Sequence, residues 1–182
     1  SLQDINVILN TSTSSLKKFG SDLFAIASLT GQSFKVAAEA ATELSRQGLG
    51  LEETLKRTKD ALILARLSGM GAAEAVMSLT AALNTFNQVG LDSTAIINKL
   101  ANVDAAFAVS SDDLAKALGR VGASAKGAGV SLDELLAIVT TAQQKTARGG
   151  AVIGNSFKTI FTRIQRPRVI GQLEELGIRV KD

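Results

Sequence analysis

Apolar residues recur at intervals of three and four positions through most of the chain, the spacing that places them on one face of an α-helix. Alternation of apolar and polar residues, which a half-buried strand needs, is missing, and alanine and leucine dominate the apolar residues. Each predicted helix therefore carries one stripe that it can bury only against another helix. The clearest stripes are Ala72, Ala75, Val76, Leu79, Leu83 and Phe86; Ile96, Leu100, Val103 and Phe107; Leu114, Ala117, Leu118, Val121 and Ala125; Leu132, Leu135, Leu136 and Val139; and Ile153, Phe157, Ile160, Phe161 and Ile164.

Helix starts recur at regular intervals. Four times a capping residue is followed three positions later by an acid, a combination that marks the first turn of a helix. Asp92 fits the same spacing, and one more helix is predicted to begin near Gly149. Consecutive starts are 18 to 21 residues apart, which leaves room for helices of about 16 residues and about 24 Å. The four pairs are Gly50 with Glu53, Gly71 with Glu74, Ser110 with Asp113, and Ser131 with Glu134.

These helices predict an all-α fold. Short connections make neighbouring helices roughly antiparallel, so we expect an irregular bundle or stack of about eight short antiparallel helices. A regular solenoid is the alternative. We favour the irregular arrangement because the units share capping residues and not a residue-by-residue signature.

The two ends of the chain are expected to differ from the middle. Residues 2–19 and 21–47 are helical in pattern, the second segment with an interruption at Thr30 and Gly31. Near the other end, Pro167 ends a helix, residues 169–176 predict a short one, and Gly177 caps it.

Three parts follow from these patterns. We expect an N-terminal helical extension over residues 1–20, a helical core domain over 21–168, and a short helix with the start of a strand over 169–182. The strand is expected because Ile178, Arg179 and Val180 alternate in polarity. A lone strand needs a partner and the chain begins at Ser1, so we expect a piece of a longer protein.

Composition narrows the chemistry. Hydrophobic residues make up 46% of the chain and there is one proline, which is typical of an ordered protein. Cysteine and histidine are absent, so disulfides, thiolate chemistry, the commonest metal ligand and the commonest general base are all missing. We expect no enzyme activity, no cofactor and no metal. The longest uncharged stretch tested, residues 75–91, has too many polar side chains for a transmembrane helix.

Two groups of residues resemble catalytic or binding motifs. The segment 149–156 has the glycine and serine spacing of a phosphate-binding loop, but Asn155 stands where that motif needs lysine, so we interpret it as a glycine-rich helix junction. Paired acids occur at residues 52–53, 112–113 and 133–134. All lie in the first turn of a predicted helix, where the helix dipole favours carboxylates, and capping explains them better than acid–base catalysis.

Positive charge is concentrated in one region. Residues 135–173 contain no acid and supply six basic residues, which account for the whole net charge of +3. Such a region can contact nucleic acid, anionic lipid or an acidic protein. A solvated helix face explains most of the pattern, because Lys158, Arg163 and Arg166 fall largely opposite the apolar stripe. The candidates for contact with an anionic partner are Lys145, Arg148, Lys158, Arg163, Arg166 and Arg168.

Several phrases of the sequence resemble one family. They are Ala106-Phe107-Ala108-Val109-Ser110-Ser111-Asp112-Asp113-Leu114-Ala115, Gly127-Ala128-Gly129-Val130-Ser131-Leu132-Asp133-Glu134-Leu135, and Lys145-Thr146-Ala147-Arg148-Gly149-Gly150-Ala151-Val152-Ile153-Gly154-Asn155 followed by Thr159-Ile160-Phe161-Thr162-Arg163. Together they are similar to the core region of phage tail tape measure proteins, a kind of minor tail protein. The likeness runs from about Phe24 to Asp182.

The resemblance implies a structural component of the virion that acts in tail assembly, tail length determination and genome delivery. It implies a place in the tail tube lumen or at the tail tip, and in the host cytoplasm during assembly. Its partners would be tail tube proteins, tail tip or baseplate proteins and other copies of itself, with transient contact to DNA or anionic membrane and no small-molecule substrate.

Two other functions are consistent with the residues alone. One is a membrane-active bundle of amphipathic helices that assists DNA entry, which predicts binding to anionic vesicles at low salt. The other is a basic module that contacts nucleic acid, which predicts affinity that falls steeply with salt and weakens when Arg163 and Arg166 are changed to Ala.

Overall fold

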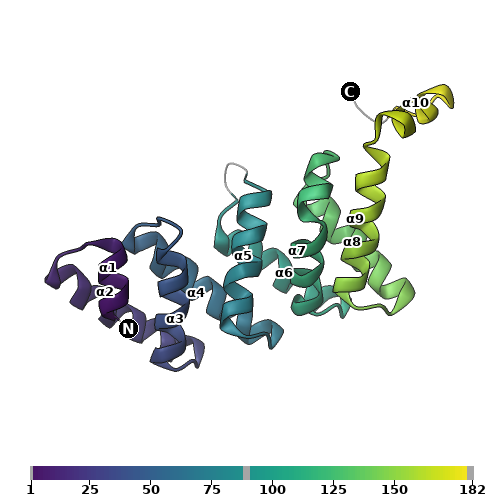
Figure 1. The fold of residues 1–182 in the computed structure, drawn as a ribbon. Coiled ribbons are helices and arrows are strands. Elements are labelled where there is room, and N and C mark those ends of the chain that lie inside the picture. Colours follow the sequence, from purple (N-terminus) through teal and green to yellow (C-terminus); the bar gives the residue numbers. More distant parts are fainter. Residues whose placement is uncertain (1, 88–90, 180–182) are drawn as a thin grey trace.

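The computed structural model describes residues 2–87 and 91–179, and these form ten α-helices and no strand (Figure 1). The all-α prediction is confirmed. The helices are α1 (Leu2–Leu9), α2 (Thr13–Thr30), α3 (Phe34–Ser45), α4 (Leu51–Ser68), α5 (Ala72–Thr85), α6 (Ser93–Phe107), α7 (Ser111–Gly127), α8 (Leu132–Thr146), α9 (Gly150–Ile164) and α10 (Pro167–Glu175).

The prediction of about eight helices is wrong, and two helix starts near the N-terminus lack the expected acid. Ser12 caps α2 and Ser33 caps α3, each by accepting a backbone N–H from three residues later. Those residues are Ser15 and Val36, so the pair of capping residue and acid is absent at both starts. The six later starts, from Gly50 to Gly149, are confirmed as the N-caps of α4 to α9.

The predicted C-terminal strand is also wrong for its described residues. Gly177 is in the left-handed conformation at φ 77°, and the Ile178 N–H donates to the Leu173 carbonyl oxygen at 2.9 Å. This hydrogen bond closes the C-terminal turn of α10, so the chain bends back where the alternation predicted extension. Arg179 is irregular, and Val180 lies outside the described residues.

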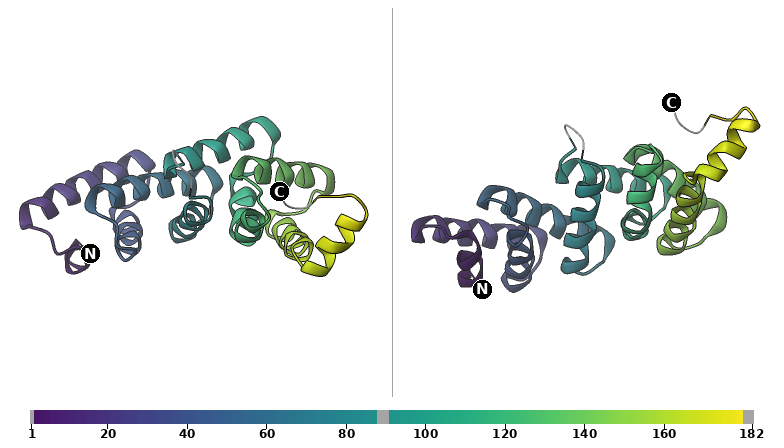
Figure 2. Two further views of the ribbon diagram at one scale, coloured as in Figure 1. Left: turned by 90° about the horizontal axis from the view of Figure 1, so that it is seen from above. Right: turned by 45° about the horizontal axis from the view of Figure 1, so that its top comes forward.

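The helices pack in two layers along the length of the molecule (Figure 2). The odd-numbered helices α1 to α9 form one layer and the even-numbered helices α2 to α8 form the other, and each helix contacts the next one in its own layer. Side-chain hydrogen bonds between described residues more than seven positions apart all span 33 to 41 positions. That separation along the chain is about twice the interval between consecutive helix starts. The helices pack together as predicted, in a two-layered stack.

One continuous core runs between the layers from Ile5 to Ile153. It is rich in small residues: Ala37, Ala38, Ala40 and Ala41 of α3 are all buried. Small side chains let neighbouring helices approach closely, which is how a chain with few aromatic residues fills its core. No single described helix has the length and apolarity to cross a membrane. Helices α4 and α5 meet these two criteria only when taken together, and the chain bends by 114° between them.

Two similar ion pairs link the even-numbered helices. Lys56 Nζ on α4 lies 2.6 Å from Asp92 Oδ2 at the N-cap of α6, and Lys99 Nζ on α6 lies 2.6 Å from Asp133 Oδ1 in the first turn of α8. The hydrogen bond between Lys56 and Asp92 raises the pKa of the lysine and lowers the pKa of the carboxyl. Both acids lie at helix starts, where the dipole favours negative charge.

The division into residues 1–20, 21–168 and 169–182 stays a prediction. Helix α2 runs without a break through the first boundary, and Phe19 and Gly20 on its inner face are buried. Helix α10 projects from the end of the stack (Figure 1).

Candidate functional site

Helices α7 and α9 lie side by side and parallel, and glycine lets them approach closely. A Cβ atom at Gly150, the first residue of α9, would lie 1.8 Å from the Asp113 carbonyl oxygen, and one at Gly154 would lie 2.9 Å from the Ala117 carbonyl oxygen. Both distances are too short for a side chain. The two glycines are four residues apart and so share one face of α9. The segment with phosphate-loop spacing is therefore a helix-packing motif, in agreement with the glycine-rich junction inferred from the sequence.

Asp113 joins the starts of both helices. Its backbone N–H donates to Ser110 Oγ at 3.1 Å, which caps α7, and its Oδ1 accepts the Gly150 N–H at 2.6 Å. Gly149, the N-cap of α9, has no side chain, so Asp113 supplies the missing capping group. One carboxylate is thus favoured by the dipoles of two parallel helices. The prediction that this acid serves in capping is confirmed.

The loops before these two helices meet beside Asp113, and we call this region the loop junction. It borders an open hollow of about 510 Å³. Gln144 Nε2 of α8 donates to the Phe107 carbonyl oxygen at 3.1 Å and so ties the end of α6 to the end of α8. The hollow is lined by Ala108, Val109, Ser110, Asp113, Gln143, Gln144, Ala147, Arg148 and Gly149.

Two polar side chains of the loop junction form no hydrogen bond or ion pair with another described side chain. Gln143 Oε1 is buried and has no hydrogen-bond partner among the described residues, and the Arg148 side chain is exposed at the rim.

Both loops turn on an alanine in the left-handed conformation. Ala108 follows α6 with φ 52°, and Ala147 follows α8 with φ 53°. A non-glycine residue in this conformation costs about 1–2 kcal/mol. The sharp turns bring the starts of α7 and α9 together.

Two other acids in the first turns of helices are engaged within their own helices. Asp112 Oδ2 accepts a hydrogen bond from Lys116 Nζ at 2.7 Å, which raises the pKa of the lysine. Glu134 accepts the Ser131 backbone N–H at 2.9 Å, which lowers the pKa of the glutamate and completes a capping box at α8. In the part of the chain that is described, no group of three or more acids could hold a metal ion.

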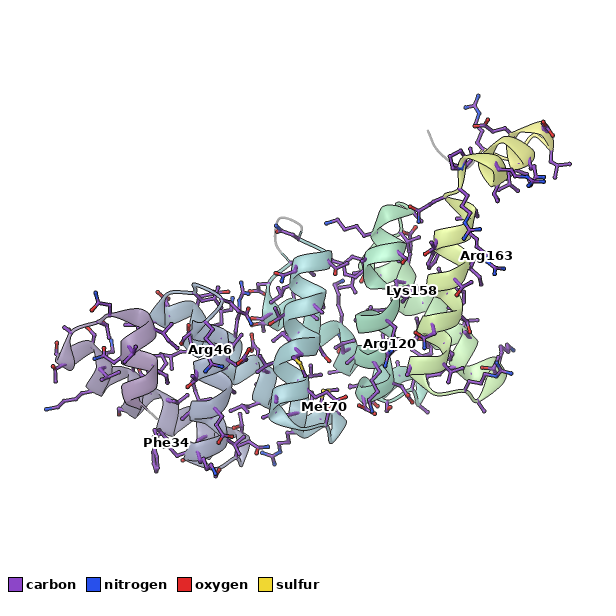
Figure 3. The ribbon with its side chains drawn as sticks, in the orientation of Figure 1. Phe34, Arg46, Met70, Arg120, Lys158 and Arg163 are labelled. Atoms are coloured by element: carbon purple, nitrogen blue, oxygen red, sulfur yellow. The ribbon has the colours of Figure 1, made fainter. Side chains whose placement is uncertain are left out.

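The six basic residues proposed for an anionic partner do not form one patch. Lys145 and Arg148 precede α9 while Arg166 and Arg168 follow it, and the 15 residues of α9 place about 22 Å between these groups. Lys158 and Arg163 lie on α9 itself (Figure 3). All six are exposed, and none pairs with an acid of the described residues. Their role stays a prediction, and their spread favours an extended partner over a compact anion.

Comparison with known protein families identifies the chain. The model of one family, described as phage-related minor tail protein, matches residues 13–182. The chain belongs to this family. Membership confirms the resemblance at the level of a phage tail protein and places this minor tail protein in the virion. The match covers α2 to α10 and includes the whole loop junction. No solved structure matches the chain.

Sequence reasoning identified the two helix starts of this minor tail protein but not their contact. The phrases at 106–115 and 145–155, which carry much of the resemblance, form the two loops that meet at the junction. Asp113 and Gly150 are 37 positions apart. The available signal was the interval between helix starts, since helices two starts apart are neighbours in a two-layered stack.

Proposed function

We propose that this minor tail protein is the core region of a tape measure protein. It is a non-enzymatic structural component that acts in tail assembly, tail length determination and genome delivery. The observation that carries the proposal is the two-layered stack, whose exposed faces and grooves extend along its length. Such stacks present long surfaces on which other proteins dock. The family match and the engagement of the acids at helix starts in capping support a structural role.

The stack is too short to be the ruler itself. Packed helices lie about 8–10 Å apart, so the four steps from α1 to α9 in the odd-numbered layer cover about 40 Å. The same 182 residues in a single helix would cover about 270 Å. We therefore assign the stack the role of a hub that docks to tail tip or tail tube proteins, while extended helix sets the length. The spread of basic residues around α9 suits an extended acidic surface of such a partner.

Deletion of residues 92–130 from the phage gene tests this proposal, because it removes α6, α7 and one side of the loop junction. We expect particles without functional tails, seen by negative-stain microscopy and plaque assay. Gly119→Ala, at an exposed position with open space around it, is the control and leaves tails normal. Infectious phage with tails of normal length would refute the structural role. Tails shortened by about 60 Å, the helical length of the deleted residues, would refute the hub and make this segment the ruler.

A further inference from the structure

Helix α10 carries an apolar face that the stack covers only in part. None of its residues is buried: Val169, Ile170 and Leu173 are partly exposed and are not among the apolar residues that pack against the core. Leu176, directly after the helix, is 74% exposed. These four residues follow helical spacing and share one face. Because a helix of nine residues is marginal alone in water, α10 is stabilised by any surface that covers this face.

The even-numbered layer ends with an open groove of matching character. Helices α2, α4 and α6 are each covered by the next even-numbered helix, but the side of α8 away from α6 is not. An apolar groove of about 460 Å³ lies there, where the next even-numbered helix of the stack would pack. It is lined by Ala137, Ile138, Thr141, Ala142 and Lys145 of α8 and by Phe157 of α9.

The connection between α9 and α10 keeps α10 away from the groove of its own chain. It consists of Gln165 and Arg166 alone. The other connections from the odd to the even layer are longer; they are residues 10–12, 46–50, 86–92 and 128–131. Gln165 is anchored, because its Nε2 donates to the Ser124 carbonyl oxygen at 3.1 Å and to the Phe161 carbonyl oxygen at 2.7 Å. Pro167 then fixes the backbone at the first position of α10. A reversal of direction onto α8 needs a longer and freer link.

We propose that α10 of one copy docks in the groove between α8 and α9 of a second copy. The apolar face of α10 fits the apolar lining, and the charges are complementary: Lys145 at the groove has no acidic partner among the described residues, while α10 carries Glu174 beside its apolar face. The short, anchored link keeps α10 away from the groove on α8 of its own chain. Such an arrangement favours exchange of the helix between copies. The docked α10 takes the place after α8 in the even-numbered layer.

Single cysteines test the contact directly, because the chain has none of its own. Thr141→Cys in one sample and Ile170→Cys in another are mixed and gently oxidised, and we expect a disulfide-linked pair of copies. Glu175→Cys, on the opposite side of α10, is the matched control and gives at least about tenfold less product. Circular dichroism of each variant checks the fold. In light scattering over a concentration series, Leu173→Asn lowers the association constant at least about tenfold and Glu175→Asn leaves it nearly unchanged.

Three outcomes would overturn the proposal. A disulfide within one chain of the Thr141→Cys, Ile170→Cys double variant at low concentration would show that α10 docks on its own copy. A product of Thr141→Cys with Phe24→Cys in equal yield would show that copies meet end to end through α2, where Phe24 is 62% exposed. A protein that is monomeric at every concentration and forms no disulfide would exclude the contact altogether.

Discussion

Replacing Gly150 by alanine should detach α9 from α7. The new Cβ would lie 1.8 Å from the Asp113 carbonyl oxygen, so the helix must move outward by more than an ångström and weaken the hydrogen bond between the Gly150 N–H and Asp113 Oδ1. Overpacking of a close contact costs about 1–3 kcal/mol, and a hydrogen bond to a charged acceptor contributes about 1.5–3 kcal/mol. We expect a loss of about 3 kcal/mol or more, a large part of the stability of a domain this size.

Two other glycines make this a graded series. Gly154→Ala places a Cβ 2.8 Å from Arg120 Cβ and 2.9 Å from the Ala117 carbonyl oxygen, so its cost should be smaller than that of Gly150→Ala. Gly119→Ala, on α7 with open space around it, should stabilise the protein by about 0.5–1 kcal/mol because alanine favours the helix.

The assay is urea unfolding followed by circular dichroism, with hydrogen exchange to locate the change. Exchange should rise in α9 and α10 of Gly150→Ala while α2 to α5 keep their protection, because each helix of a stack depends on its neighbours. A loss below about 1 kcal/mol, or a cost for Gly119→Ala equal to that for Gly150→Ala, would refute the account of the close contact.

Three further predictions concern single side chains. Asp113→Ala should cost about 1.5–3 kcal/mol in urea unfolding because its carboxylate caps α9, whereas Asp133→Ala, which removes an exposed ion pair, should cost less than about 1 kcal/mol; equal costs would contradict this cap. Thr140→Val should raise the thermal midpoint, because the buried Thr140 hydroxyl has no partner among the described residues; a lower midpoint would show that this hydroxyl is bonded in solution. The lowered pKa of Asp92 means that its contribution is present above the ordinary carboxyl pKa and lost as pH falls through the lowered value, so unfolding free energy should fall below about pH 4, less so in Asp92→Asn; identical acid profiles for the two proteins would contradict this.

Local chemistry explains why most helix starts could be predicted. A cap depends on residues within one turn, such as Ser131 and Glu134, whose reciprocal bonds form the capping box of α8. Where only half of that signal is present, as at Ser12, the start was missed. The false strand at Ile178 has a similar cause, because alternation over three residues is a weaker signal than a left-handed glycine that closes a helix.

The distribution of charge shows where sequence reasoning about the site reaches its limit. Six basic residues within residues 135–173 form one region in the sequence, yet the length of α9 separates Arg148 from Arg166 in space. Conversely, Asp113 and Gly150 belong to different phrases and meet at 2.6 Å. Distance along a helical chain is a poor guide to distance in a stack.

The sequence by itself determined the all-α class, the starts of six helices and the likeness to a phage tail protein, because capping, periodicity and recurring phrases are local properties. The tertiary structure decided which helices are neighbours, why Gly150 and Gly154 must be glycine, and which apolar faces are only partly covered at α8 and α10. These depend on how closely two helix backbones approach, and that distance is set by residues of both helices together.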